Sequence, residues 1–144
     1  MDHIKKAKEL YEKGFYCSQA VLAAFSDELG LTEKQALQVG SCFGGGMCKG
    51  EVCGACTGAL MVLGMKYGRY IFDDWDSQMK ANDMAIRFLD EFSKENGSYI
   101  CNELLGCDIA TLEGKSYARE QKLFAELCPK MVVSAAKITE QLIQ

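Results

Sequence analysis

Apolar residues recur three and four positions apart along most of the chain, and no stretch alternates apolar with polar residues. That spacing is typical of amphipathic helices, whereas half-buried strands would show a period of two. Proline, which breaks a helix when it lies in its interior, occurs only once, at Pro129. The length of 144 residues suits one domain. We therefore predict an all-α fold, a compact single-domain bundle of about six to eight helices over residues 1–144.

Capping residues and glycine stops divide this pattern into segments. Thr32 and Gln35 form a capping box at the start of one helix, and Pro129 occupies a favoured first helical position. The helix around residue 85 should turn an apolar stripe inward that includes Met79, Phe88 and Phe92. The expected helices cover residues 2–13, 17–29, 33–42, 53–67, 74–96, 101–106, 115–127 and 129 onward.

Glycine is concentrated in the middle of the chain, where nine of the 14 glycines lie between residues 40 and 68. The run 44–46 predicts a glycine-rich loop, and the apolar segment that follows it predicts a buried central helix. Gly54 and Gly58 lie four residues apart and share one face of that helix. Small residues there would let another helix or a bound group approach closely, so both are candidate cofactor-binding positions.

Charge and hydropathy exclude two classes of function. The net charge of −4 and the pI of about 5.1 argue against a nucleic-acid partner, which would require a basic face. No uncharged run is longer than that of residues 52–65, which is too short to span a bilayer, so we expect no membrane insertion. The charged N-terminal segment does not resemble a signal peptide, which predicts a cytoplasmic protein.

Cysteine is the residue type available for chemistry. There are eight cysteines but one histidine, His3, which lies near an end of the chain that we expect to fray. Triads and zinc sites that depend on histidine are therefore disfavoured. Cytoplasmic thiols are mostly reduced, so redox chemistry or metal binding explains eight cysteines better than a disulfide framework does.

Four cysteines fall at or just before an expected helix start: Cys17, Cys53, Cys101 and Cys128. Unpaired N–H groups and the helix dipole favour the thiolate at such positions, and the thiolate is the form that attacks disulfides and binds metals. Cys53 and Cys56 also form a C-x-x-C pair, which can close a disulfide or ligate one metal ion. With Cys48 they reproduce the C-x4-C-x2-C spacing of plant-type [2Fe–2S] ferredoxins.

Five motifs follow one another in a recognisable order. They are Cys17-Ser18-Gln19-Ala20-Val21, Gly44-Gly45-Gly46-Met47, Glu51-Val52-Cys53-Gly54-Ala55-Cys56-Thr57-Gly58-Ala59-Leu60-Met61, Cys101-Asn102-Glu103-Leu104-Leu105-Gly106 and Cys128-Pro129-Lys130. Over about residues 11–136 the chain resembles the C_GCAxxG_C_C family, whose name records a redox role inferred from its cysteines.

The resemblance implies that the four helix-start cysteines are the family cysteines and that the motif glycines are Gly54 and Gly58. It also implies a link to electron transfer, because a similar module looks to be joined to cytochrome and iron–sulfur chemistry in some anaerobic proteins. The chain departs from the family pattern by carrying four further cysteines, whose roles the pattern leaves open: Cys42, Cys48, Cys56 and Cys107.

Three hypotheses follow. In the first, the chain is a redox protein that acts by thiol–disulfide exchange, with Cys53 as nucleophile and Cys56, Cys17, Cys101 or Cys128 as resolving thiol. In the second, the four family cysteines bind an iron–sulfur cluster or zinc, and the chain carries electrons rather than turning over a substrate. In the third, it is a non-catalytic helical interaction protein with buried cysteines. The expected partners are a redox partner protein and a second copy in a homodimer.

Overall fold

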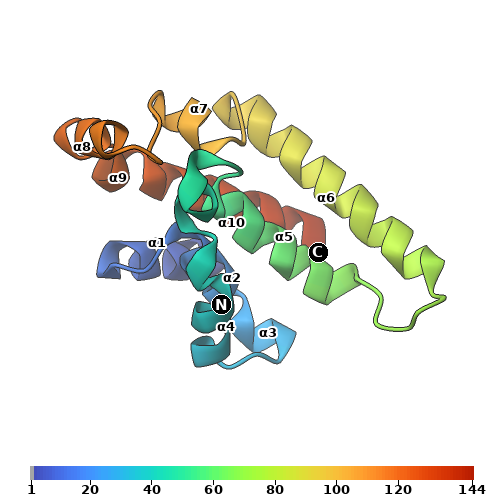
Figure 1. The fold of residues 1–144 in the computed structure, drawn as a ribbon. Coiled ribbons are helices and arrows are strands. Elements are labelled where there is room, and N and C mark those ends of the chain that lie inside the picture. The colour runs from blue at the N-terminus through green and yellow to red at the C-terminus, as the bar shows by residue number, and fades with distance from the viewer. Residues whose placement is uncertain (1) are drawn as a thin grey trace.

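The chain folds into helices joined by short loops in a computed structural model that describes residues 2–144 (Figure 1). No strand occurs among these residues, which confirms the all-α prediction. One isolated antiparallel bridge pairs Val52 with Ile100. The elements are α1 (His3–Lys13), α2 (Cys17–Ala24), α3 (Ser26–Leu29), α4 (Glu33–Val39), η1 (Gly40–Cys42), η2 (Gly46–Gly50), α5 (Gly54–Tyr67), α6 (Trp75–Asn96), α7 (Cys101–Leu105), α8 (Leu112–Glu120), α9 (Leu123–Glu126) and α10 (Cys128–Ile143).

Helix α5 lies at the centre of the packing, against α2, α6 and α10 (Figure 1). Its sequence is apolar on nearly all sides, as expected for a helix surrounded by others. Gly58 makes the contact with α2 possible, because a Cβ atom at this position would lie 2.7 Å from the Ser18 carbonyl oxygen. The largest buried side chains around this centre are Phe25, Phe88 and Phe92.

Two of the expected helices are broken in the structure. Phe25, with ψ near 5°, separates α2 from α3, and the following Ser26 hydroxyl donates back to the Ala23 carbonyl. Lys122 has a left-handed backbone with φ 58° and separates α8 from α9. No glycine or proline marks either break, and the helical spacing of apolar residues continues across both. The sequence therefore predicted unbroken helices at these two places.

The expected inward stripe of α6 is wrong at Met79, whose side chain is 63% exposed. The cause is length: α6 has 22 residues and spans about 33 Å, whereas α5 has 14 and spans about 21 Å. The first turns of α6 therefore extend past the core, and its buried positions begin at Met84. The loop before α6 is also open, with Tyr70 95% and Phe72 86% exposed.

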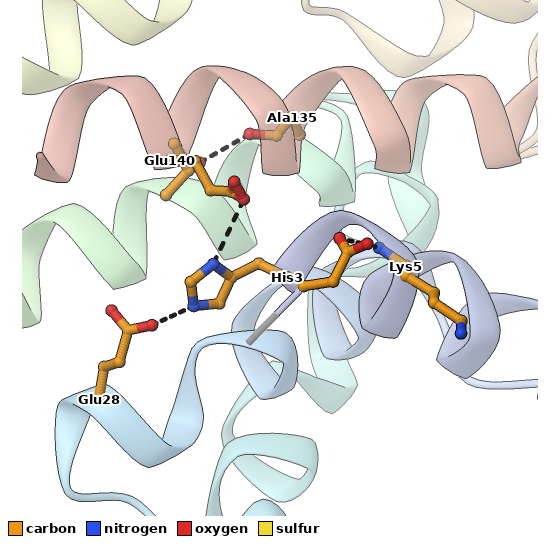
Figure 2. Close-up of polar contacts among 7 residues, drawn as sticks. His3, Lys5, Glu28, Ala135 and Glu140 are labelled. Carbon is orange, nitrogen blue, oxygen red and sulfur yellow. Dashed lines mark hydrogen bonds and ion pairs between the residues drawn. The ribbon is translucent and has the colours of Figure 1, made fainter.

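His3 does not fray, contrary to expectation. Its ring stacks on Phe25 with centroids 4.2 Å apart. One ring nitrogen, Nδ1, lies 3.4 Å from a carboxylate oxygen of Glu140, and Nε2 faces Glu28 (Figure 2). The only histidine thus joins the start of α1 to α3 and α10, which is a structural role.

Within residues 2–144, no helix combines the length and the apolar character that crossing a bilayer requires.

The contact of α5 with α2 can be tested with two alanine substitutions in the same helix. Gly58→Ala should lower the free energy of unfolding by about 1–3 kcal/mol, because its methyl group would press on the α2 backbone. Gly64→Ala is the matched control, since nothing lies within 4 Å of its Cβ position, and it should raise stability by about 0.5–1 kcal/mol. Urea denaturation under reducing conditions measures both. Equal effects would contradict the packing described for Gly58.

Candidate functional site

One cavity brings together the four cysteines that the sequence singled out. Its volume is about 440 Å³, and it lies where α1, α2, α7, α8 and α10 meet the loop before α5. Cys17 is the first residue of α2, Cys53 immediately precedes α5, Cys101 opens α7 and Cys128 opens α10. The other lining residues are Tyr11, Gly14, Phe15, Tyr16, Gly44, Gly45, Cys48, Gly54, Leu105, Ile109, Lys115, Arg119, Phe124 and Met131.

The isolated bridge places Cys53 beside Cys101. The Cys53 N–H donates to the Tyr99 carbonyl over 2.8 Å, and the Cys101 N–H donates to the Glu51 carbonyl over 2.6 Å. These reciprocal bonds pair the residues that precede α5 and α7. Both cysteines therefore enter their helices from one short antiparallel pairing.

Cys17 is positioned by the two residues that follow it. The Ser18 hydroxyl donates to the Gly40 carbonyl over 2.6 Å, and the Gln19 amide donates to the Leu37 carbonyl over 2.9 Å. The start of α2 is thereby tied to the end of α4. Gly54 completes the arrangement, because a Cβ at this position would collide with the Cys17 sulfur.

The glycine-rich segment has an unusual backbone. Four consecutive residues, 45–48, have φ between 59° and 66°, including the non-glycine residues Met47 and Cys48. Left-handed backbone costs a non-glycine residue roughly 1–2 kcal/mol, so the surrounding contacts must hold it. A Cβ at Gly46 would collide with the Glu51 backbone. The segment turns tightly, and Gly45 reaches the cavity wall, where its backbone faces the Cys17 sulfur.

Asn102 is a positioning residue that the sequence analysis did not identify. Its side-chain oxygen accepts the Ile109 N–H over 3.1 Å, and its amide donates to Asp108 over 3.0 Å. It also packs on Gly50, where a Cβ would collide with it. One side chain next to Cys101 thus connects η2, α7 and the loop before α8. Its place directly after a family cysteine was the available signal.

The Cys17 sulfur lies against Gly54, the residue that directly follows Cys53, so the Cys17 and Cys53 thiols are neighbours. The Cys53 thiol, followed by burial, raises the pKa of Cys17 well above its ordinary value. For Cys53 the largest influence is the Cys17 thiol, which lowers its pKa, but Cys56 and burial together outweigh it and the net direction is upward. Within this pair, the Cys17 thiol therefore favours the thiolate of Cys53, whereas Cys53 disfavours that of Cys17.

Burial also raises the pKa of Cys101 to about 12 and that of Cys128 to about 11, with further contributions from Cys17. Tyr11 opposes the shift at Cys128 through a hydrogen bond. The Tyr11 hydroxyl proton itself is donated to the Phe124 carbonyl over 2.7 Å. These upward pKa shifts differ from the expectation that helix starts favour the thiolate. Burial removes water from the thiols, and the neighbouring sulfurs also disfavour the charged form. Together these two effects outweigh the helix dipole.

The remaining candidate residues lie around this centre. Cys56 is completely buried beneath Cys53 and does not line the cavity, whereas Cys48 is exposed and lies on its wall. Cys107 is half-buried near Cys101, and Cys42 is exposed away from the cavity. Gly58 packs against α2 of the same chain.

No three His, Cys, Asp or Glu side chains among residues 2–144 are arranged to hold a single metal ion. All eight cysteines are free thiols. What the arrangement offers directly is a pair of neighbouring thiols, Cys17 and Cys53, with Cys48, Cys101 and Cys128 lining the same cavity.

The raised pKa values predict a loss of stability at alkaline pH. An unfolded cysteine ionises near pH 9.0, whereas Cys128 in the folded chain has a pKa of about 11. From about pH 9 upward the unfolded state therefore loses a proton that the folded state retains, and the free energy of unfolding falls as pH rises toward 11. We expect Cys128 to account for about 1–2 kcal/mol of this decline. Urea denaturation from pH 8 to 11 under reductant measures it.

The comparison variants are Cys128→Ser, which should flatten part of that decline, and Cys42→Ser, at an exposed position, which should reproduce the wild-type curve. A Cys128→Ser curve parallel to that of the wild type would contradict the assignment.

A comparison with known protein families identifies a match over most of the chain. A family profile described as "Putative redox-active protein (C_GCAxxG_C_C)" matches residues 15–142. No curated protein and no solved structure matches the chain. The matched region contains all five cysteines that line the cavity and both motif glycines. Because the profile spans nearly the whole chain, the chain belongs to the C_GCAxxG_C_C redox-active protein family.

Proposed function

We propose that the cavity is the redox centre of this family member and that it acts by thiol–disulfide exchange through Cys17 and Cys53. The observation that carries the proposal is the convergence of four family cysteines on one cavity, with the Cys17 sulfur against Gly54, directly after Cys53. Cys101 and Cys128 complete the same wall.

Within the pair, Cys53 is the attacking thiol, because Cys17 acts to lower the pKa of Cys53 whereas Cys53 acts to raise that of Cys17. Its thiolate attacks one sulfur of an external disulfide, RSSR, and releases RS⁻ as the mixed disulfide forms. Cys17 then attacks the Cys53 sulfur and releases the second RS⁻. The Cys17–Cys53 disulfide forms, RSSR is reduced to two RSH, and the protons of the two cysteines pass to the products. Since the net pKa of Cys53 is raised, the rate should increase with pH above neutrality.

An iron–sulfur cluster is the second candidate, and one observation favours it. Of the five cysteines that line the cavity, the four family cysteines come from the starts of four separate helices, which is twice the number that a dithiol requires. The residues that would hold a cluster are Cys17, Cys53, Cys101 and Cys128, and its positive charge would reverse the upward pKa shifts of these thiols. A bound cluster would supply one-electron transfer. Zinc is less favoured, because no three donors are placed around one ion within residues 2–144.

The partners and location follow from the same proposal. A disulfide-bearing molecule or an electron-transfer protein serves as redox partner, and free thiols suit the reducing cytoplasm. A homodimer would have to use a surface other than the one around Gly54 and Gly58, because the latter packs against α2. Thiol exchange with a substrate would make the chain an enzyme, whereas a cluster would make it an electron carrier.

Two measurements on protein purified without oxygen or chelators test the proposal. Iron, zinc and acid-labile sulfide are first determined per chain. The reduced protein is then treated with 2-hydroxyethyl disulfide, after which its thiols are counted and its disulfide is mapped. We expect little metal, loss of two of the eight thiols and a Cys17–Cys53 bond. Cys17→Ser should stop at a mixed disulfide on Cys53, and Cys42→Ser should still close the pair.

Near-stoichiometric iron with matching sulfide would replace this mechanism with the cluster. Retention of all eight thiols in protein without metal would overturn both, and would leave a helical interaction protein with buried cysteines.

A further inference from the structure

Two basic side chains lie on the wall of the cysteine cavity. Lys115 and Arg119 are four residues apart on α8, so they share one face of that helix, and both line the cavity. The short orange helices α8 and α9 lie at the end of the molecule away from the loop between α5 and α6 (Figure 1). The two cations therefore belong to the cysteine end of the fold.

Their charge is not balanced within the cavity. No aspartate or glutamate lines it, and neither Lys115 nor Arg119 forms an ion pair with a carboxylate among residues 2–144. The chain as a whole carries a net charge of −4, so the two positive charges at the cavity contrast with the negative charge of the whole chain. A wall with two unpaired cations beside neutral thiols attracts an anion.

The remaining wall sets the size and polarity of the ligand. About 440 Å³ accommodates a small molecule, but not a folded protein segment. Apolar side chains from several elements cover the rest of the cavity and would contact the body of the ligand: Phe15, Leu105, Ile109, Phe124 and Met131. The site thus combines thiols, an apolar surface and a cationic side.

We propose that the substrate of this site is a small disulfide that carries a carboxylate or another acidic group, bound by Lys115 and Arg119 with its sulfur–sulfur bond directed at Cys53. The inference rests on the proposed dithiol function. The two cations orient the substrate and take no part in electron transfer. Reduction consumes one disulfide and the two cysteine thiols, and yields the Cys17–Cys53 disulfide and two small acidic thiols.

Three reagents of different charge test the inference: 3,3′-dithiodipropionate (anionic), 2-hydroxyethyl disulfide (neutral) and cystamine (cationic). The rate of Cys17–Cys53 disulfide formation is measured with each and divided by the rate of the same reagent with dithiothreitol, which removes differences in intrinsic reactivity. We expect the normalised rate with the anionic reagent to exceed that with the cationic one by about tenfold at low salt. The ratio should approach one at about 1 M salt, where the screening length is about 3 Å.

The double variant Lys115→Gln/Arg119→Gln should bring the ratio close to one at low salt. Lys137→Gln, a lysine on α10 that does not line the cavity, is the matched control and should retain the wild-type ratio. A ratio near one in the wild type, with the disulfide still forming, would overturn the acidic substrate and leave the dithiol function standing. If no reagent closes the Cys17–Cys53 pair, the proposed function itself fails.

Discussion

The close approach of α5 to α2 is the contact on which the cavity depends. Gly58 lets the α2 backbone pass beside the helix, and Gly54 leaves space for the Cys17 sulfur. Because α5 begins directly after Cys53, this approach also brings the sulfurs of Cys17 and Cys53 together. A methyl group at either glycine would disturb both the core and the cavity. The same two motif glycines, Gly54 and Gly58, are therefore needed both for packing of the core and for the shape of the cavity.

The backbone then adds the other two cysteines. Pairing of Val52 with Ile100 carries Cys101 to the side of Cys53, and α10 begins at Cys128, which lines the same cavity. The left-handed segment at residues 45–48 directs the chain back from η1 to this pairing. Strain there is a cost that the contacts of η2 with Asn102 offset. Irregular backbone thus concentrates around the site, while the long helices supply the stability.

Electrostatics in the cavity combine two opposing effects. Burial holds the thiols in their neutral form, as the pKa values near 11 and 12 of Cys128 and Cys101 indicate. The cations on α8 act in the other direction, since they attract negative charge to the same space. Thiols that stay protonated are protected from unselective oxidation, because the thiolate is the reactive form.

Much of this could be predicted from the sequence, because it rests on local signals. The helical spacing of apolar residues and the capping residues predicted the all-α class. They also placed the ends of helices such as α5 and α6 within a residue or two. Motif order identified the four cysteines. The breaks at Phe25 and Lys122 and the exposure of Met79 depend on how far each helix reaches along its neighbours, which no local pattern records. Only the tertiary structure decided that the cysteines share one cavity and that Lys115 and Arg119 lie beside them. It also decided that burial opposes ionisation of the cysteines. All three features depend on distances between residues that are remote in sequence, and for that reason no local pattern could predict them.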